Sequence, residues 1–84
     1  MASYKVVITA RAARDISALQ EATRRRIGEK LAEYSRNPLQ YARKLSDPKI
    51  GNFRFRIGEY RVIFDLVGND LIVLRVGHRR EIYR

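Results

Sequence analysis

Residues 53–64 carry the sequence FRFRIGEYRVIF, which is the strongest structural signal in the chain. Apolar side chains alternate with Arg54 and Arg56 before residues 58–59, and Arg61 interrupts the apolar residues that follow; the pattern is typical of two half-buried strands joined by a two-residue turn. With a loop of that length, Arg56 lies opposite Arg61. The pattern therefore predicts an antiparallel hairpin with one apolar face and one face that carries Arg54, Arg56 and Arg61.

A strand and two helices are predicted upstream of this hairpin. Residues 4–9 have the β-branched character of a short buried strand, and Thr9 can then cap a helix that runs to residue 19. A second helix is expected over residues 22–35, and Asn37-Pro38 ends it because a residue before proline avoids the helical region. We expect the helices to turn the following side chains toward the core: Ala13, Ile16, Leu19, Ile27, Leu31 and Tyr34.

Downstream, the apolar period of two continues. Residues 60–67 and 71–76 are predicted strands, residues 39–51 read as a loop, and a basic tail follows from residue 77. The fold expected from this order is α+β. An N-terminal strand, a two-helix hairpin and three antiparallel strands build one domain over residues 1–84, with a four-stranded sheet packed by the helices on its apolar face.

Composition narrows the class of function. The chain has 84 residues with 18 Lys and Arg against 9 Asp and Glu, and the formal charge of +9 indicates a polyanionic partner, nucleic acid first. There is no cysteine and one histidine, so we expect no disulfide framework, no metal site and no cofactor. The longest apolar run, residues 71–74, is far shorter than the ~20 residues of a membrane helix. We therefore expect a soluble cytoplasmic protein with no membrane partner.

The arginine face of the hairpin is the leading candidate site. Like charges that face each other across strands repel, so Arg54, Arg56 and Arg61 suggest an anion that spans them, such as a phosphodiester backbone. Two other interpretations stay open: a solvated face that only keeps the protein in solution, or a surface that docks an acidic protein. Further basic residues are candidates for contacts with RNA or the ribosome: Arg43, Lys44, Lys49, Arg75, Arg80 and Arg84.

The basic tail adds the only histidine and a tyrosine. We expect the strand before it to carry His78, Arg79 and Tyr83 beside the arginine face. RNA cleavage needs cations for the transition-state charge, a group that transfers protons near neutral pH, and often an aromatic ring that stacks on a base. Alone, His78 can equally be a bystander and Tyr83 can simply cap the core.

Two segments together resemble the signature of the RelE/ParE toxins. They are residues 53–64, quoted above, and residues 74–83, which read LRVGHRREIY. The strand at residues 4–8, Asn37-Pro38 and Lys44-Leu45 also match. The resemblance covers nearly the whole chain, and the order and spacing of the pieces are specific for the superfamily.

The resemblance implies a RelE-like toxin with a fold similar to that of the microbial ribonucleases. Such a toxin is held inactive by a RelB-like antitoxin in a hetero-oligomer and, once freed, enters the ribosomal A site and cuts messenger RNA there. Its partners would then be the antitoxin, messenger RNA and the ribosome with its RNA. Family members cut without a metal, because the 2′-OH of the RNA attacks, and a 2′,3′-cyclic phosphate is the expected product.

Residue by residue, the resemblance assigns the catalytic positions of the family to Arg54, Arg56, Arg61, Arg79 and Tyr83. Arg56 departs from members in which a basic residue acts as the base, because a guanidinium scarcely deprotonates. His78 stands before Arg79, where several relatives also show histidine, and imidazole suits acid and base chemistry. The identity of the proton acceptor stays open.

Two other functions remain after the resemblance is weighed. The ParE branch of the same fold poisons DNA gyrase and cleaves nothing, although its members generally lack this concentration of basic and aromatic residues. A degenerate copy that keeps only the antitoxin-binding fold is the other alternative.

Overall fold

The hairpin predicted from residues 53–64 forms in the computed structural model, which describes residues 3–47 and 49–82. Strands β3 (Phe53–Ile57) and β4 (Tyr60–Val67) pair antiparallel, and Arg56 lies opposite Arg61 as expected. Gly58 in the turn has a φ of 59°, a conformation that glycine adopts without steric cost and that tight hairpin turns require.

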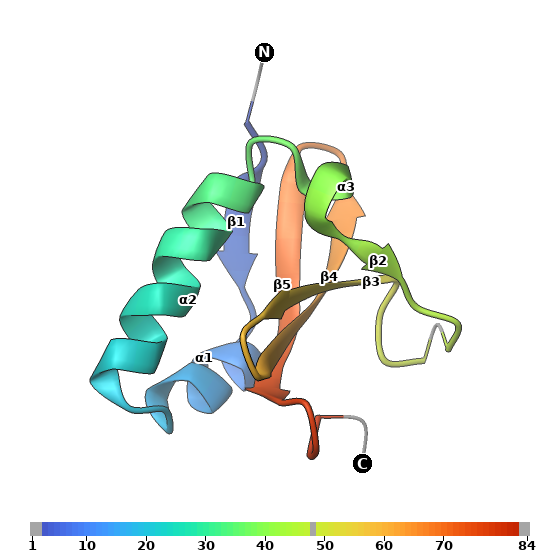
Figure 1. Cartoon of the computed structure of the whole chain (residues 1–84). Coiled ribbons are helices and arrows are strands. Elements are labelled where there is room, and N and C mark those ends of the chain that lie inside the picture. Colours follow the sequence, from blue (N-terminus) through green and yellow to red (C-terminus); the bar gives the residue numbers. More distant parts are fainter. Residues whose placement is uncertain (1–2, 48, 83–84) are drawn as a thin grey trace.

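The sheet has five strands where four were predicted. Strand β5 (Asp70–His78) pairs antiparallel with β4, β1 (Lys5–Ile8) pairs parallel with β5, and β2 (Arg43–Lys44) pairs antiparallel with β3. The order across the sheet is β1-β5-β4-β3-β2 (Figure 1). The fifth strand is β2, which lies within the predicted loop and gives the backbone of β3 a partner on its other side.

A short helix, α3 (Pro38–Tyr41), also lies in the segment predicted as a loop. Proline stands at its first position, where the absent N–H costs nothing, so Pro38 ends α2 and begins α3. The ring of Tyr41 stacks on Tyr34 with centroids 4.2 Å apart, which connects α3 to the end of α2.

Helices α1 (Ala10–Ser17) and α2 (Glu21–Tyr34) cover one face of the sheet, as predicted (Figure 1). Thr9 caps α1, because its hydroxyl accepts a hydrogen bond from the Ala12 N–H and donates one of 2.8 Å to the Val73 carbonyl. The prediction for Ala13 was wrong, since Ala13 is exposed and Ala12 is buried. Positions 12, 16 and 19 form one stripe of the helical period, and position 13 lies about 100° away from position 12.

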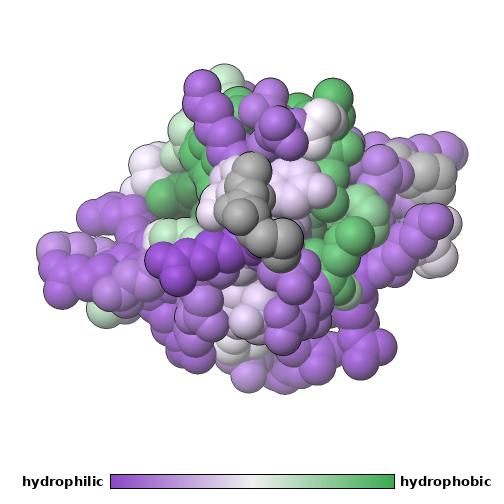
Figure 2. Space-filling model, turned by 90° about the horizontal axis from the view of Figure 1, so that it is seen from above, coloured by the Kyte–Doolittle hydropathy of each residue, from purple (hydrophilic) through white to green (hydrophobic). Residues whose placement is uncertain are grey.

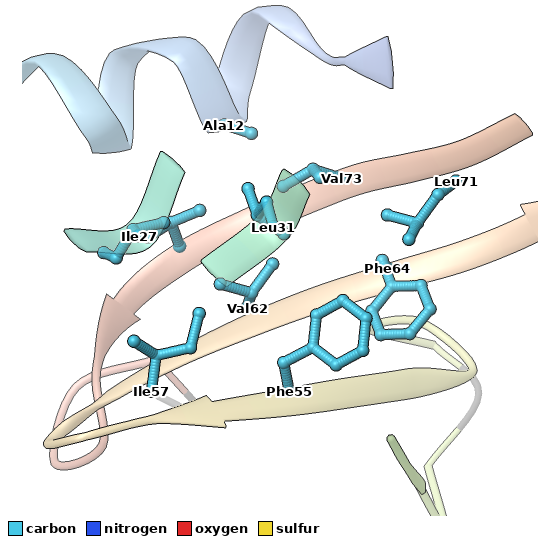
Figure 3. Packing of buried hydrophobic residues seen from close by; sticks show 10 residues of the cluster. Ala12, Ile27, Leu31, Phe55, Ile57, Val62, Phe64, Leu71 and Val73 are labelled. Carbon is cyan, nitrogen blue, oxygen red and sulfur yellow. The ribbon is translucent and has the colours of Figure 1, made fainter. Parts of the chain in front are cut away.

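The core lies between these helices and the apolar face of the sheet. Figure 3 shows Phe55, Val62 and Phe64 rising from the strands toward Ile27 and Leu31 of α2. The rings of Phe55 and Phe64 stack with centroids 4.2 Å apart. The apolar alternation of the hairpin thus defines the floor of the core.

A register shift between Ile63 and Phe64 interrupts the pairing of β4 with β5. Ile63 faces Arg75 and Phe64 faces Val73, so Leu74 is an extra residue in β5. An extra residue reverses the faces of all residues that follow it in the strand. Val73 and Val76, three positions apart, therefore both reach the core.

The surface is not uniformly hydrophilic. Figure 2 views the end of the molecule at which β4 turns into β5, and apolar areas interrupt the hydrophilic surface there. Leu39 and Val67 are the most exposed large apolar side chains among the described residues. None of the helices formed by residues 3–47 and 49–82 has the length and hydrophobicity of a membrane-spanning segment.

Candidate functional site

A basic concavity of about 770 Å³ lies on the face of the hairpin that is turned away from the core. We call it the arginine basin. Its basic lining residues are Lys44, Arg54, Arg56, Arg61, Arg79 and Arg80. The described part of the loop of residues 45–51, which is 45–47 and 49–51, supplies the rest of the lining: Leu45, Ser46, Asp47 and Ile50. The predicted grouping of Arg54, Arg56 and Arg61 on one face is confirmed.

Hairpin geometry positions the arginines. Arg54 and Arg56 alternate with core residues along β3, and the two-residue turn sets Arg56 directly opposite Arg61. Guanidinium groups at facing positions repel each other, so a bound anion relieves an unfavourable arrangement that the fold imposes.

Arg61 differs from its neighbours because it is buried, with 6% of its surface exposed. Its Nη1 donates hydrogen bonds of 3.0 Å to the Gly58 carbonyl and 2.9 Å to the Tyr60 carbonyl. The sequence predicted a guanidinium presented to solvent for phosphate binding. Instead, this guanidinium donates hydrogen bonds to carbonyl groups of its own turn. Arg61 is buried below the surface of the basin and contributes positive charge to it.

Arg79 is held at the basin by the turn of the hairpin. Its backbone N–H donates a 2.8 Å hydrogen bond to the Glu59 carbonyl, and its Nε lies 2.6 Å from Glu59 Oε2. Both side chains are at least half exposed, so the ion pair itself contributes little to stability. It fixes the position of Arg79 and leaves its guanidinium at the surface.

The loop of residues 45–51 is anchored on this outer face. The Leu45 N–H donates a 2.8 Å hydrogen bond to the Asn52 carbonyl, and the Asn52 N–H donates one of 2.8 Å to Asp65 Oδ1. Gly51 packs so closely on Ile63 that a Cβ would lie 2.5 Å from Ile63 Cγ2. Ile63 is fully buried although it does not belong to the main core, because the loop covers it.

His78 does not lie in the arginine basin, contrary to the prediction. It pairs with Tyr60, whose ring packs against the core, and it lines a separate cleft between α1 and the end of β5. Its ring meets the Tyr60 ring edge-on, and its Nδ1 accepts a 3.2 Å hydrogen bond from the Arg80 N–H. The extra residue Leu74 is the physical reason, because it reverses the later positions of β5 and turns Arg79, not His78, toward the basin.

Arg75 also lies at the α1 cleft and is engaged there. Its Nε lies 2.9 Å from Asp15 Oδ2, and the Val76 N–H donates to the same oxygen at 3.0 Å. Burial raises the pKa of the Asp15 carboxyl, but the hydrogen bonds from Val76 and Arg75, with the charges of Arg75 and Arg11, outweigh it and lower that pKa below its ordinary value. Arg75 thus ties α1 to β5.

The remaining predicted site residues, which are the contact residues and the catalytic candidate Tyr83, divide into three groups. Lys44 and Arg80 line the basin. Arg43 and Lys49 are exposed beside it but are not part of its lining. Tyr83 and Arg84 lie outside the described residues.

Sequence reasoning missed the loop as a wall of the site. Leu45, Asp47 and Ile50 show no periodicity, so no pattern indicated that they fold over the sheet. Pro48 and Gly51 signalled a loop but not its direction. Within the described part of the chain, no group of His, Asp and Glu side chains is arranged to hold a metal ion.

The basin suits the binding of a phosphodiester. Guanidinium groups bind phosphate oxygens with paired, charge-assisted hydrogen bonds, and cations fixed in advance also stabilise charge that develops during a reaction. Several such groups along two strands can follow successive phosphates of one RNA strand.

Comparison with known proteins gives a consistent likeness. The family described as "ParE toxin of type II toxin-antitoxin system, parDE" matches residues 6–83. Toxin RelG of Mycobacterium tuberculosis (strain ATCC 25618 / H37Rv) is 33% identical over 84 residues, with 96% of this chain and 97% of that relative covered.

Solved structures give the same result. A chain of the toxin–antitoxin complex RelBE2 from Mycobacterium tuberculosis superposes with a TM-score of 0.84 at 30% identity, with 93% of this chain and 100% of that chain covered. A chain of the archaeal RelE–RelB complex from Pyrococcus horikoshii has a TM-score of 0.76 at 23% identity, with 95% and 99% covered. The second likeness concerns the fold alone.

Proposed function

Because the chain belongs to the RelE/ParE family of toxins from type II toxin–antitoxin systems, we propose that it is an endoribonuclease that cleaves messenger RNA in the ribosomal A site. The arginine basin is the observation that carries this proposal. It gathers Lys44, Arg54, Arg56, Arg61, Arg79 and Arg80 around one concavity, with Asp47 as the one carboxylate among the described lining residues.

The proposed reaction is an attack of the RNA's own 2′-OH on the adjacent phosphate, without a metal. It breaks the bond to the 5′-oxygen and leaves a 2′,3′-cyclic phosphate. Arg54, Arg56 and Arg79 hold the scissile phosphate and offset the charge of its transition state. The ribosome holds the message in line for attack, so orientation supplies much of the rate.

The proposed roles of Arg61, Tyr83 and His78 differ from those of the other basin residues. We propose that Arg61 acts mainly by shaping the turn and adding positive potential, since its Nη1 is bonded to the Gly58 and Tyr60 carbonyls. Tyr83 keeps the catalytic position that the family resemblance assigns to it, where its ring can stack on an unpaired base or its hydroxyl can bond to the RNA. His78 is left out of the proposed site, because its ring lies in the α1 cleft.

A RelB-like antitoxin is the proposed regulatory partner. The support is the RelBE2 toxin–antitoxin complex, one chain of which is 30% identical to this chain over most of its length. A net charge of +9 favours an acidic or amphipathic segment that covers or distorts the arginine basin. A complex in which Arg54 and Arg79 stay open and still bind RNA would mean that neutralisation works in another way, such as bulk exclusion from the ribosome.

Inhibition of DNA gyrase without any cleavage is the second candidate function. The observation in its favour is that the matching family carries the ParE description. The basin speaks against it, because a protein that only poisons gyrase needs no array of cations suited to a phosphodiester.

Primer extension in a purified translation system with added protein tests the proposal. We expect breaks within the codon that occupies the A site, and no inhibition of gyrase in a DNA supercoiling assay. Intact messages together with inhibited supercoiling would replace the nuclease by the gyrase poison. Inactivity in both assays would indicate a degenerate toxin.

A further inference from the structure

Asp47 is the one carboxylate among the cations that line the arginine basin in the described part of the chain. Its Oδ1 accepts a 3.0 Å hydrogen bond from the Lys49 N–H, which fixes the carboxylate within the loop. Within residues 3–47 and 49–82, no cation forms an ion pair with Asp47. An ionised carboxylate so placed has an oxygen left with which to accept a proton.

The loop that carries Asp47 is anchored at its second end. Asn52 is bonded to Asp65, and Gly51 packs on Ile63. At its first end the Leu45 N–H is bonded to the Asn52 carbonyl. Asp47 therefore stands on a short closed segment over the arginines, where a general base must lie within reach of the proton that it takes.

The other candidate bases are occupied or misplaced. Glu59 is paired with Arg79, and Asp65, which accepts the Asn52 N–H, is not among the residues that line the basin. Asp15 and His78 line the α1 cleft and not the basin. The arginines of the basin cannot serve, because a guanidinium does not deprotonate near neutral pH.

We propose that Asp47 is the general base of the cleavage reaction, an inference that rests on the proposed nuclease function. The Asp47 carboxylate takes the proton of the 2′-OH, and the 2′-oxygen forms a bond to phosphorus. The bond from phosphorus to the 5′-oxygen breaks, and the 5′-oxygen takes a proton from water. The hydroxide that remains recovers the proton from Asp47, so the products are a 2′,3′-cyclic phosphate and a 5′-OH with no net gain or loss of water.

Single-turnover cleavage of a message on purified ribosomes tests this assignment with Asp47→Asn, Asp47→Ser and Asp47→Glu. For Asp47→Asn and Asp47→Ser we expect a maximal cleavage rate about 10²–10³-fold lower than that of the wild type. The toxin concentration that gives half of the maximal rate should not rise. Asp47→Glu should regain part of the rate. Asp70→Asn is the matched control. It makes the same chemical change at the first residue of β5, whereas the basin residue Arg79 follows the last residue of that strand, so this variant should cleave like the wild type.

The two roles of this carboxylate, electrostatic and chemical, predict different results. Asp47→Asn removes a negative charge from a site that binds a polyanion, so a purely electrostatic role predicts tighter binding and an undiminished maximal rate. That outcome, or a rate equal to the wild type in both Asp47→Asn and Asp47→Ser, overturns the assignment while the nuclease function stands. If the wild type itself does not cleave, the proposed function has failed instead.

A modified message separates a general base from a general acid. When sulfur replaces the 5′-bridging oxygen, the leaving thiolate needs no proton, so loss of a general acid no longer slows cleavage. We expect Asp47→Asn to stay slow on this substrate relative to the wild type. Recovery to the wild-type rate would make Asp47 an acid and contradict the proposal.

Discussion

The guanidinium groups of the arginine basin fall into two kinds, and burial separates them. Arg56 is exposed, whereas Arg61 is buried beneath the turn that its Nη1 bonds. An exposed guanidinium beside another cation gains little from the folded state and is available to a ligand. A buried one that satisfies carbonyl groups also supports the fold.

Loss of a basin arginine that still reaches solvent should slow cleavage without unfolding the protein; Arg54 is partly exposed and Arg79 is exposed. For Arg54→Ala and Arg79→Ala we expect about 2–4 kcal/mol less transition-state stabilisation, which lowers the rate by about 30-fold to 900-fold. Single-turnover cleavage on ribosomes measures it. Arg36→Ala, an exposed arginine outside the basin lining, is the control and should retain the wild-type rate. Equal rates in all three variants would show that the basin is not the active site.

Replacing Arg61 and replacing Arg56 should have different effects on the stability of the protein, although the two residues face each other across the hairpin. Arg61→Ala leaves the Gly58 and Tyr60 carbonyls without this donor and should lower the free energy of unfolding by about 1–3 kcal/mol. Arg56→Ala should leave it nearly unchanged or raise it, because a like-charge pair is relieved. Urea denaturation of both variants measures the difference. Equal destabilisation would contradict the distinction drawn from burial.

Elements place these residues, and two contacts between elements can be tested. The first is the packing of the loop of residues 45–51 on β4 and β5. Gly51 has a φ of +144°, which other residues rarely adopt, and a Cβ there would lie 2.5 Å from Ile63 and 3.1 Å from Leu74 Cδ1. Gly51→Ala should therefore destabilise the fold by about 1–3 kcal/mol and slow cleavage by displacing the loop.

Gly28→Ala is a suitable control for this change. Gly28 lies in α2, where nothing lies within 4 Å of an added Cβ, so alanine should not destabilise the helix there. Thermal unfolding and the cleavage rate are measured on both variants. A Gly51→Ala protein as stable and as active as the wild type would mean that the loop is not fixed over the basin.

The second contact joins α1 to β5 through Asp15. The pKa of Asp15 is lowered from its ordinary value of 3.8, so its ionised form stabilises the folded state above that value. This contribution is lost as the pH falls through the lower pKa of the folded state. Asp15→Asn should reduce the free energy of unfolding by about 1 kcal/mol at pH 7, and the difference from the wild type should shrink below about pH 4.

Urea denaturation from about pH 2 to about pH 7 measures how the stability difference between Asp15→Asn and the wild type depends on pH. This range brackets the titration of carboxylates. Glu29→Gln, an exposed position on α2, is the control and should show no such convergence. A difference between Asp15→Asn and the wild type that stays constant across the range would mean that the charge of Asp15 does not stabilise the contact.

Among the elements, the alternation of apolar and basic residues predicted the hairpin, its register and its arginine face, because successive side chains of a strand point alternately to the core and to solvent. It did not predict the short elements α3 and β2, whose lengths are below what periodicity can indicate. It also misplaced His78, because the extra residue Leu74 reverses the end of β5 and carries no signature in the sequence. The sequence therefore predicted the part of the arginine basin that the strands form and missed the part that the loop forms.

For the whole molecule, a charge of +9 on 84 residues predicted a polyanionic partner, but the charge alone could not locate the basic face. The basin arises because the strands, the tail and the loop meet on the side of the sheet that the helices leave open (Figure 1). The family match and the fold both identify a RelE/ParE toxin. The proposed reaction depends on whether the arginine basin promotes the cleavage of RNA.

One measurement tests that chemistry most directly. Ribosomes are programmed with two short messages that differ only in the A-site codon, which carries ribose in one and deoxyribose in the other. We expect the toxin to cut only the ribose message, with a 2′,3′-cyclic phosphate at the new end detected by mass spectrometry. Cleavage of the deoxyribose codon, or an uncut ribose message on correctly programmed ribosomes, would contradict the account.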